Sequence, residues 1–123
     1  PYQDKKDIPY SMTACDVSLV SVSEGMESLV APSKLYPALA AGRPIAVICP
    51  EGTYLEELVK GGDCGSVFGN DDSQELASFL KLLSNDSDLS KKIGQQGRQK
   101  MESDFTPQTI GQQYFKVLKA TEK

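Results

Sequence analysis

The fold of this chain is decided by residues 30–50, which read VAPSKLYPALAAGRPIAVICP. The stretch predicts a short alanine-rich helix that opens near Ser33 and ends at Gly42, because glycine accepts a left-handed C-cap and Pro44 cannot continue a helix. The apolar, β-branched run at residues 45–49 then predicts a buried strand. A helix that leads directly into a buried strand is typical of an α/β fold.

The same alternation continues on both sides of this stretch. Residues 16–22 read DVSLVSV and predict a strand covered on both faces, because apolar side chains occur at both odd and even positions and so point to both sides of the strand. Residues 64–68 predict a further short strand. Other helices are expected at residues 8–15, 54–61, 73–83, 87–101 and 107–120, with Asp7 and Thr53 as caps of the first two. We therefore expect one α/β domain over residues 1–123, with a partial Rossmann-like parallel sheet of three to four strands flanked by helices.

Composition excludes several classes of function. Net charge is −4 and the pI is about 4.8, which argues against nucleic-acid binding, because that function needs a basic face. No run of 18 apolar residues predicts a transmembrane helix. Three cysteines without a C-x-x-C spacing, and the lack of histidine, disfavour both a disulfide framework and a Cys/His zinc site. We expect a protein of the reducing cytoplasm with no bound metal.

Residues 32–34 are the candidate for ligand binding. They precede the alanine-rich helix and follow the strand at residues 16–22, so they are expected at the carboxyl edge of the sheet, where open α/β folds bind ligands. Free N–H groups at the helix start, the hydroxyl of Ser33 and the charge of Lys34 together suggest a pyrophosphate cradle. Many βα units share these features and bind nothing, so the residues alone leave both interpretations open.

Two further features of this helix need a tertiary explanation. Its small residues at positions 38 and 40–42 predict a close approach to the sheet. Pro37 lacks a donor that a helix starting at Ser33 would use, whereas a helix capped at Lys34 places Pro37 in the first turn, where its missing donor matters little.

The chain resembles the group 1 glycosyltransferases (family 4), the retaining nucleotide-sugar enzymes of GT-B architecture. The matching stretches are residues 16–20, 27–36 and 40–45, which read DVSLV, ESLVAPSKLY and AAGRPI. The block from Pro32 to Pro44 is similar to a bacterial branch of colanic-acid and amino-sugar transferases. The resemblance extends over nearly the whole chain, because the tail after Asp71 looks like the closing helices of that family.

The resemblance implies that residues 1–123 are the later part of the donor-binding domain, and that an N-terminal, acceptor-binding domain belongs to the parent protein. It implies a nucleotide-diphospho-sugar as the donor substrate, no cofactor, and an acceptor that the sequence does not identify. It also leaves open a peripheral membrane association of the parent protein. Retaining sugar transfer is the implied reaction of the parent, whereas these 123 residues alone are expected to catalyse nothing.

The same resemblance implies roles for individual residues. Glu27 would face the sugar as the catalytic carboxylate. The donor would contact the residues at Glu24, Val30, Ala31, Pro32, Ser33, Lys34 and Pro37. At Pro37 the family usually has a second glutamate that holds the ribose, and proline has no side-chain acceptor. Two alternatives therefore remain: a GT-B-type sugar-nucleotide epimerase, and a non-catalytic domain that binds nucleotide-sugars or other proteins.

The last predicted helix carries an apolar stripe formed by Tyr114, Phe115, Val117 and Leu118. The stripe could pack on the chain's own sheet, on a second copy or, by family resemblance, on the N-terminal domain. The oligomeric state does not follow from the sequence.

Overall fold

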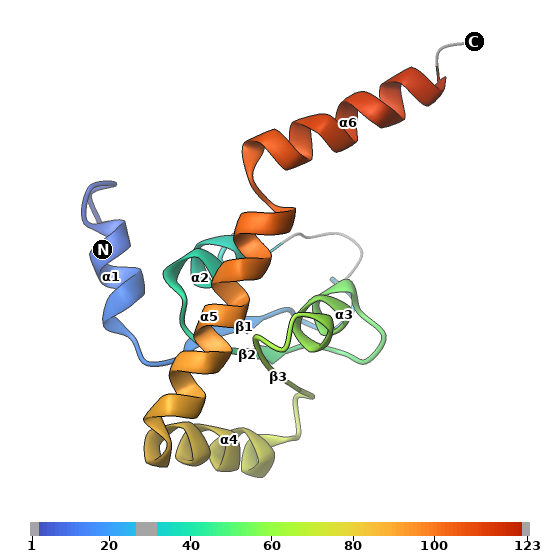
Figure 1. The fold of residues 1–123 in the computed structure, drawn as a ribbon. Helices are drawn as coiled ribbons and strands as arrows, with labels where there is room; N and C mark the ends of the chain where they lie inside the picture. Colours follow the sequence, from blue (N-terminus) through green and yellow to red (C-terminus); the bar gives the residue numbers. More distant parts are fainter. Residues whose placement is uncertain (1–2, 27–31, 122–123) are drawn as a thin grey trace.

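The computed structural model describes residues 3–26 and 32–121. Within those ranges it contains six helices and three strands (Figure 1). Their order is α1 (Ile8–Ala14), β1 (Ser18–Ser21), α2 (Leu35–Ala41), β2 (Ile45–Ile48), α3 (Tyr54–Gly61), β3 (Gly65–Phe68), α4 (Ser73–Asn85), α5 (Ser87–Asp104) and α6 (Pro107–Thr121). The strands form one parallel sheet in the order β1-β2-β3, so the predicted α/β class and partial Rossmann-like sheet are confirmed.

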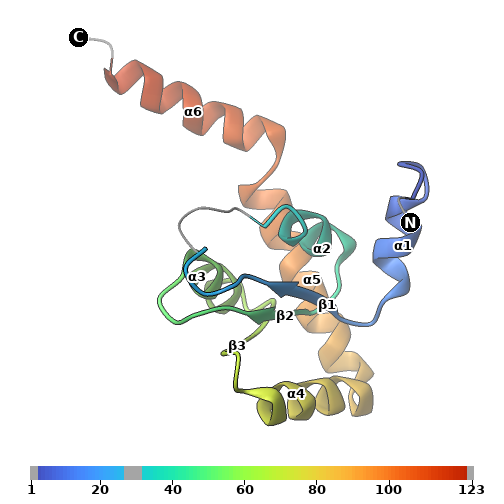
Figure 2. The same cartoon turned by 180° about the vertical axis from the view of Figure 1, so that it is seen from behind.

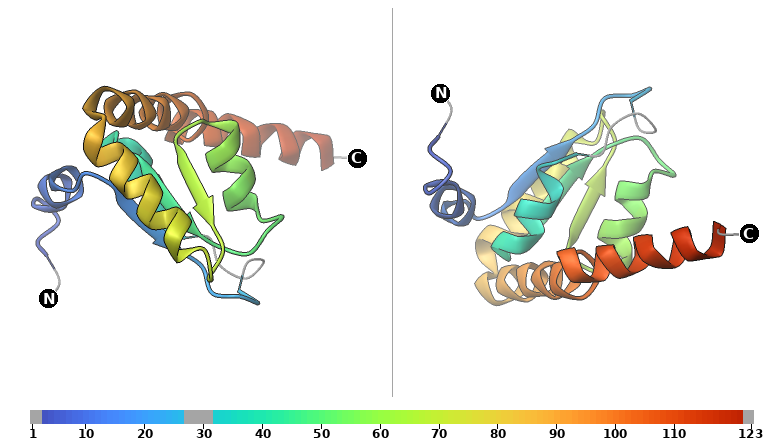
Figure 3. Two further views of the ribbon diagram at one scale, coloured as in Figure 1. Left: turned by 90° about the horizontal axis from the view of Figure 1, so that it is seen from below. Right: turned by 90° about the horizontal axis from the view of Figure 1, so that it is seen from above.

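Helices cover both faces and one edge of the sheet. Helices α2 and α3 lie on one face and α4 lies on the other, as the views from above and below show (Figure 3). Helix α5 crosses the amino-terminal edge, where it contacts Gly42 just before β2 and Cys64 just before β3. The carboxyl ends of the strands therefore face away from α5 and are bordered by loops.

The main core lies between the sheet and the pair α2 and α3. Leu39 of α2, Val47 of β2 and Val59 of α3 are completely buried there. Each such side chain contributes about 1.5–3 kcal/mol when it leaves water. A smaller contact on the opposite face joins Phe79 of α4 to Phe68 of β3, with ring centroids 5.7 Å apart. Two layers of helices thus hold the strands in place.

Helix α2 starts at Leu35, with Lys34 at the N-cap position and no side-chain hydrogen bond to the helix. The interpretation of Ser33 as the N-cap is therefore wrong, and the alternative start at Lys34 is confirmed. Pro37 is the third helical residue, within the first turn, where no N–H has an intrahelical acceptor. The helix ends at Gly42, whose φ of 67° is left-handed as predicted.

The small residues of α2 meet a helix as well as the sheet. Ala38 lies in the core, as expected from a close approach to the strands. Gly42 lies against α5, because a Cβ on Gly94 would come within 2.1 Å of the Gly42 carbonyl oxygen. From the same helix, Arg98 Nη1 donates a hydrogen bond of 2.5 Å to the carbonyl oxygen of Ala40. The contact between α2 and α5 was not predicted, since the residues of α5 lie more than fifty positions further along the chain.

Strand β1 is less covered than predicted. Val20 is buried, whereas Leu19 on the opposite face keeps 58% of its surface exposed. The expectation of a strand covered on both faces is therefore wrong for β1. The reason is that α4 packs under β3, at the far edge of the sheet, and leaves this side of β1 open.

The start of α3 shows the predicted capping pattern. Thr53 Oγ1 accepts a hydrogen bond of 3.3 Å from the Glu56 N–H. The Glu56 carboxylate reaches back one residue further than in the usual capping box, because it accepts from the Gly52 N–H at 2.7 Å. These two bonds satisfy backbone donors at the loop-to-helix junction.

We expect Thr53→Ala to lower the free energy of unfolding by about 1 kcal/mol, because the Glu56 N–H loses its acceptor. Urea denaturation followed by circular dichroism measures this loss. Thr53→Ser keeps the oxygen and serves as the control, so an equal loss in both variants would contradict the capping role.

Candidate functional site

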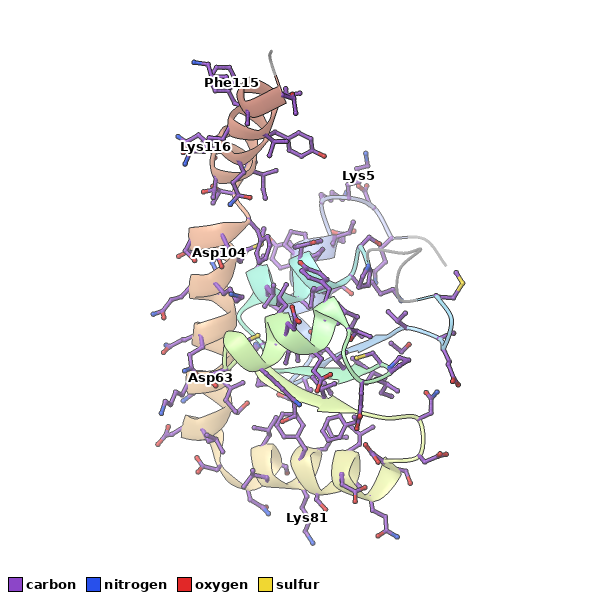
Figure 4. All side chains as sticks on the ribbon, turned by 90° about the vertical axis from the view of Figure 1, so that its right-hand side faces the viewer. Lys5, Asp63, Lys81, Asp104, Phe115 and Lys116 are labelled. Carbon is purple, nitrogen blue, oxygen red and sulfur yellow. The ribbon has the colours of Figure 1, made fainter. Side chains whose placement is uncertain are left out.

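The candidate site is the carboxyl edge of the sheet, where three loops follow the three strands. Figure 2 views this side, with β1 in front of the other strands, and in Figure 4 the same edge lies on the right, opposite α5. The first loop leaves β1 at Val22 and the second runs from Cys49 to Thr53. The third spans residues 69–72 and leads into α4. Because no helix crosses this edge within the described residues, it is open to a ligand.

The predicted donor-binding residues that the structure describes lie at this edge. Helix α2 ends beside α5 at the amino-terminal edge, so its first turn points back to the carboxyl edge. Ser33 and Lys34 are exposed there, and Pro32 accepts a hydrogen bond of 3.0 Å from the Leu35 N–H. Glu24 is exposed in the turn that follows β1, at the same edge.

Three other predicted residues, Glu27, Val30 and Ala31, lie outside the described residues. Their roles stay predictions. Pro37 is exposed on the first turn of α2, where it lines a hollow of about 300 Å³ together with Pro9 and Met12 of α1.

A pair of tyrosines joins the first turns of α2 and α3 and was missed in the sequence. The hydroxyl oxygens of Tyr36 and Tyr54 lie 3.3 Å apart, and the ring of Tyr36 meets Phe105 edge to face at 5.2 Å. Tyr54 keeps 49% of its surface exposed, and its partial burial, followed by the hydrogen bond to Tyr36, raises the pKa of its phenol above the usual range. The pair could have been suspected, because both helices were predicted to begin at the same edge.

The part of this edge next to β2 and β3 is acidic. A pocket of about 300 Å³ is lined by Glu51, Glu56, Asp71 and Asp72, with Lys60 as its basic residue. Lys60 Nζ donates to Glu56 at 2.5 Å, and this bond, together with the Gly52 N–H, lowers the pKa of the Glu56 carboxyl. Since the one lysine is already paired, the pocket would repel a phosphate.

The two halves of the carboxyl edge differ in charge. The half formed by β1 and α2 carries Glu24 and Lys34, and Lys34 forms no ion pair among the described side chains. An anion at this edge would meet less negative charge beside Lys34 than beside the carboxylates next to β3.

Within residues 3–26 and 32–121, no group of three or more His, Cys, Asp or Glu residues could hold a metal ion. Cys15, Cys49 and Cys64 are free thiols, and burial raises the pKa of Cys64. No helix in these ranges is long and apolar enough to cross a membrane.

Comparison with known proteins supports a relationship to glycosyltransferases. No protein-family model and no solved structure matches the chain. Over 50 residues the chain is 38% identical to a protein of Pseudomonas aeruginosa that is named "Probable glycosyltransferase WbjE". The matched segment covers 41% of this chain and only 12% of that protein, so the chain spans a small part of its relative. The similarity establishes a glycosyltransferase-like relationship over that segment.

Proposed function

We propose that this chain forms part of the donor-binding domain of a glycosyltransferase that uses a nucleotide-diphospho-sugar. The observation that carries the proposal is the 38% identity over 50 residues to a protein named as a probable glycosyltransferase. The parallel sheet supports it, because its carboxyl edge is open and ligands of α/β folds bind at that edge. The parent protein is proposed to be a cytoplasmic, retaining hexosyltransferase of group 1, family 4, with GT-B architecture.

The open side of β1 supports the proposal that the domain continues beyond these residues. Beside β1 lies a hollow of about 780 Å³, lined in part by Val17, Leu80 and Leu83. Leu19 also remains exposed on this strand. Doubly wound sheets contain more than three strands and bury both faces, so a further strand and helix would fit here. In the proposed parent, these elements would come from the same domain, and an N-terminal domain would hold the acceptor.

Sugar transfer breaks the bond between the anomeric carbon and the β-phosphate oxygen, and that oxygen gains negative charge. Catalysis then requires positive charge and aimed N–H groups near the leaving diphosphate. In our proposal Lys34 supplies the charge, and the backbone from Val30 to Lys34 supplies N–H donors. Ser33 adds a hydroxyl, and Glu27 contacts the sugar as the catalytic carboxylate. Glu24 is the second acidic candidate beside the donor.

Nucleotide binding tests this proposal on the 123-residue chain itself. UDP, GDP and ADP are titrated separately, and binding is followed by calorimetry and by backbone amide chemical shifts. We expect weak binding of one of them, with shifts concentrated at residues 32–36, and no sugar transfer by this chain alone. If no nucleotide binds, or if the shifts gather at the amino-terminal edge beside α5, the proposal is wrong.

Lys34→Gln is expected to weaken that nucleotide binding roughly three- to tenfold, because one charge-assisted contact to the diphosphate is lost. Lys92→Gln removes the same charge from the exposed surface of α5 and is the matched control. Equal affinity loss in the two variants would show that net charge, and not a contact to Lys34, determines binding. Sugar transfer by the full-length parent then distinguishes a transferase from an epimerase or a non-catalytic domain.

A further inference from the structure

The pair of tyrosines between α2 and α3 has no role in the function proposed above. Tyr36 is the second residue of α2 and Tyr54 is the first residue of α3, and both helices begin at the carboxyl edge of the sheet. Their hydroxyl oxygens lie 3.3 Å apart, so the two side chains meet between the first turns of these helices. The pair therefore lies at the same edge as Lys34, which precedes Tyr36 by two positions.

The two rings of this pair differ in their surroundings. The ring of Tyr36 is half-buried and meets the ring of Phe105 edge to face. Phe105 itself packs against the main core, so Tyr36 is supported from behind. The side chain of Tyr54 is exposed, and its hydroxyl is the end that contacts Tyr36. The hydrogen bond thus holds one end of a ring that remains accessible to a ligand.

Helix α6 leaves Tyr54 uncovered within the part of the chain that the structure describes. It begins at Pro107, just after Phe105, and extends away from the sheet (Figures 1 and 2). Its apolar stripe therefore does not pack on the chain's own sheet. The four side chains of the stripe keep 58–70% of their surface exposed, namely those of Tyr114, Phe115, Val117 and Leu118.

The chemistry of the pair suits a flat, uncharged group that carries hydroxyls. A hydrogen bond between two phenols uses one of their two hydroxyl hydrogens, so the second hydrogen and the remaining lone pairs stay available to a ligand. An exposed aromatic ring offers a stacking surface to a nucleobase, because every base has a π-face. A nucleoside combines such a base with the hydroxyls of a ribose.

The order of groups along the carboxyl edge favours the nucleoside over the sugar of the donor. In the proposed function, the loop after β1 holds the sugar and Lys34 contacts the diphosphate. The nucleoside is attached to the opposite end of the diphosphate, so it would extend from α2 toward α3. The carboxylates of Glu51 and Glu56 near the start of α3 disfavour a further anionic group there, whereas an uncharged base and ribose meet no such repulsion.

We propose that Tyr36 and Tyr54 form the nucleoside contact of the donor site, with the base stacked on the ring of Tyr54 and the hydroxyl pair bonded to the ribose. The assignment rests on the proposed function, because it needs a nucleotide whose diphosphate lies beside Lys34. Tyr54 touches the ligand, and Tyr36 also positions Tyr54. Since stacking accepts any base, the pair supplies affinity rather than the choice of base.

Comparison of a nucleotide with inorganic pyrophosphate tests this assignment on the 123-residue chain. The nucleotide is whichever of UDP, GDP and ADP binds best, and pyrophosphate lacks the nucleoside. We expect Tyr54→Ala to weaken nucleotide binding roughly fivefold or more and to change pyrophosphate binding by less than about twofold. Tyr10→Ala removes another exposed tyrosine, on α1, and is the matched control that should change neither affinity.

The hydroxyls are tested apart from the ring. Tyr54→Phe and Tyr36→Phe each keep a ring and break the bond between the two phenols. We expect each to weaken nucleotide binding by about threefold, less than Tyr54→Ala, because the stacking surface of Tyr54 remains. A loss in Tyr54→Phe as large as that in Tyr54→Ala would contradict stacking on this ring.

Nuclear Overhauser effects in the unmodified chain provide a test that needs no variant. With the nucleotide bound, we expect effects between the ring protons of Tyr54 and protons of the base. Their absence at saturation would overturn the assignment, even if Tyr54→Ala failed to fold. Far-UV circular dichroism verifies that each variant used for binding keeps its helices.

The outcomes separate this assignment from the proposed function. If no nucleotide binds to the unmodified chain, the proposed function is wrong and the assignment falls with it. If the nucleotide binds beside Lys34 equally well in Tyr54→Ala, only the assignment is overturned. Equal losses of nucleotide and pyrophosphate binding in Tyr54→Ala would also overturn it, since Tyr54 would then act on the diphosphate rather than on the nucleoside.

Discussion

Gly65→Ala is expected to destabilise the protein by more than about 3 kcal/mol, a large share of the roughly 5–15 kcal/mol that stabilises a typical domain. A Cβ at position 65 would lie 1.8 Å from the carbonyl oxygen of Ile45 and 2.7 Å from its carbonyl carbon. These are backbone atoms of β2, directly opposite Gly65 in the parallel ladder, so they cannot rotate away. Moving β3 instead would strain the 3.0 Å hydrogen bond from Ile45 N–H to the Cys64 carbonyl oxygen.

Urea denaturation followed by circular dichroism measures the effect of Gly65→Ala. Gly61→Ala, at the end of α3, is the matched control, because a Cβ there would meet no atom within 4 Å. We expect the control to change the free energy of unfolding by less than about 1 kcal/mol. Similar unfolding midpoints for the two variants would contradict the close approach of β3 to β2.

Gly94→Ala is expected to cost a comparable amount, by separating α5 from α2. The added Cβ would lie 2.1 Å from the Gly42 carbonyl oxygen and 3.2 Å from Arg43 Cα, both of which are backbone atoms. Relief requires α5 to move outward, which weakens the 2.5 Å bond from Arg98 to the Ala40 carbonyl. We expect a loss of about 3 kcal/mol or more in the free energy of unfolding.

The control for this variant is Gly111→Ala, in the interior of α6, where a Cβ would meet nothing within 4 Å. Alanine has the higher helix propensity, so this variant should gain up to about 1 kcal/mol of helix stability. The same substitution is therefore expected to lower the free energy of unfolding at position 94 and to raise it at position 111. Equal destabilisation of both variants would contradict the steric explanation for Gly94→Ala.

Gly94→Ala also bears on the candidate site. Helix α2 has seven residues, so the contact at Gly42 and the exposed Lys34 are separated by the length of this one short helix. If α2 gives way at its carboxyl end while α5 moves outward, its first turn moves as well. Any nucleotide binding that depends on Lys34 should therefore weaken in Gly94→Ala under conditions where the variant remains folded.

Most of the local structure was predictable from the sequence. Gly42 and Pro44 ended α2 as expected, and Thr53 capped α3 through the Glu56 N–H. The three strands and their parallel arrangement followed from short apolar runs separated by helices. For the candidate site, the sequence correctly predicted that α2 begins at the carboxyl edge of the sheet. The predicted capping role of Ser33 was wrong, because Lys34 occupies the N-cap position.

Tertiary packing decided the rest. Helix α5 crosses the amino-terminal edge because Gly94 packs closely against the backbone of Gly42. No local sequence pattern relates those two positions. The contact between Tyr36 and Tyr54, the exposure of Leu19 and the free face of α6 are likewise set by where whole elements come to lie. Backbone sterics and capping act over a few residues, and the sequence alone therefore determined the elements and their order. Burial depends on neighbours brought together from distant segments, and only the folded chain determined which faces are covered and which remain free.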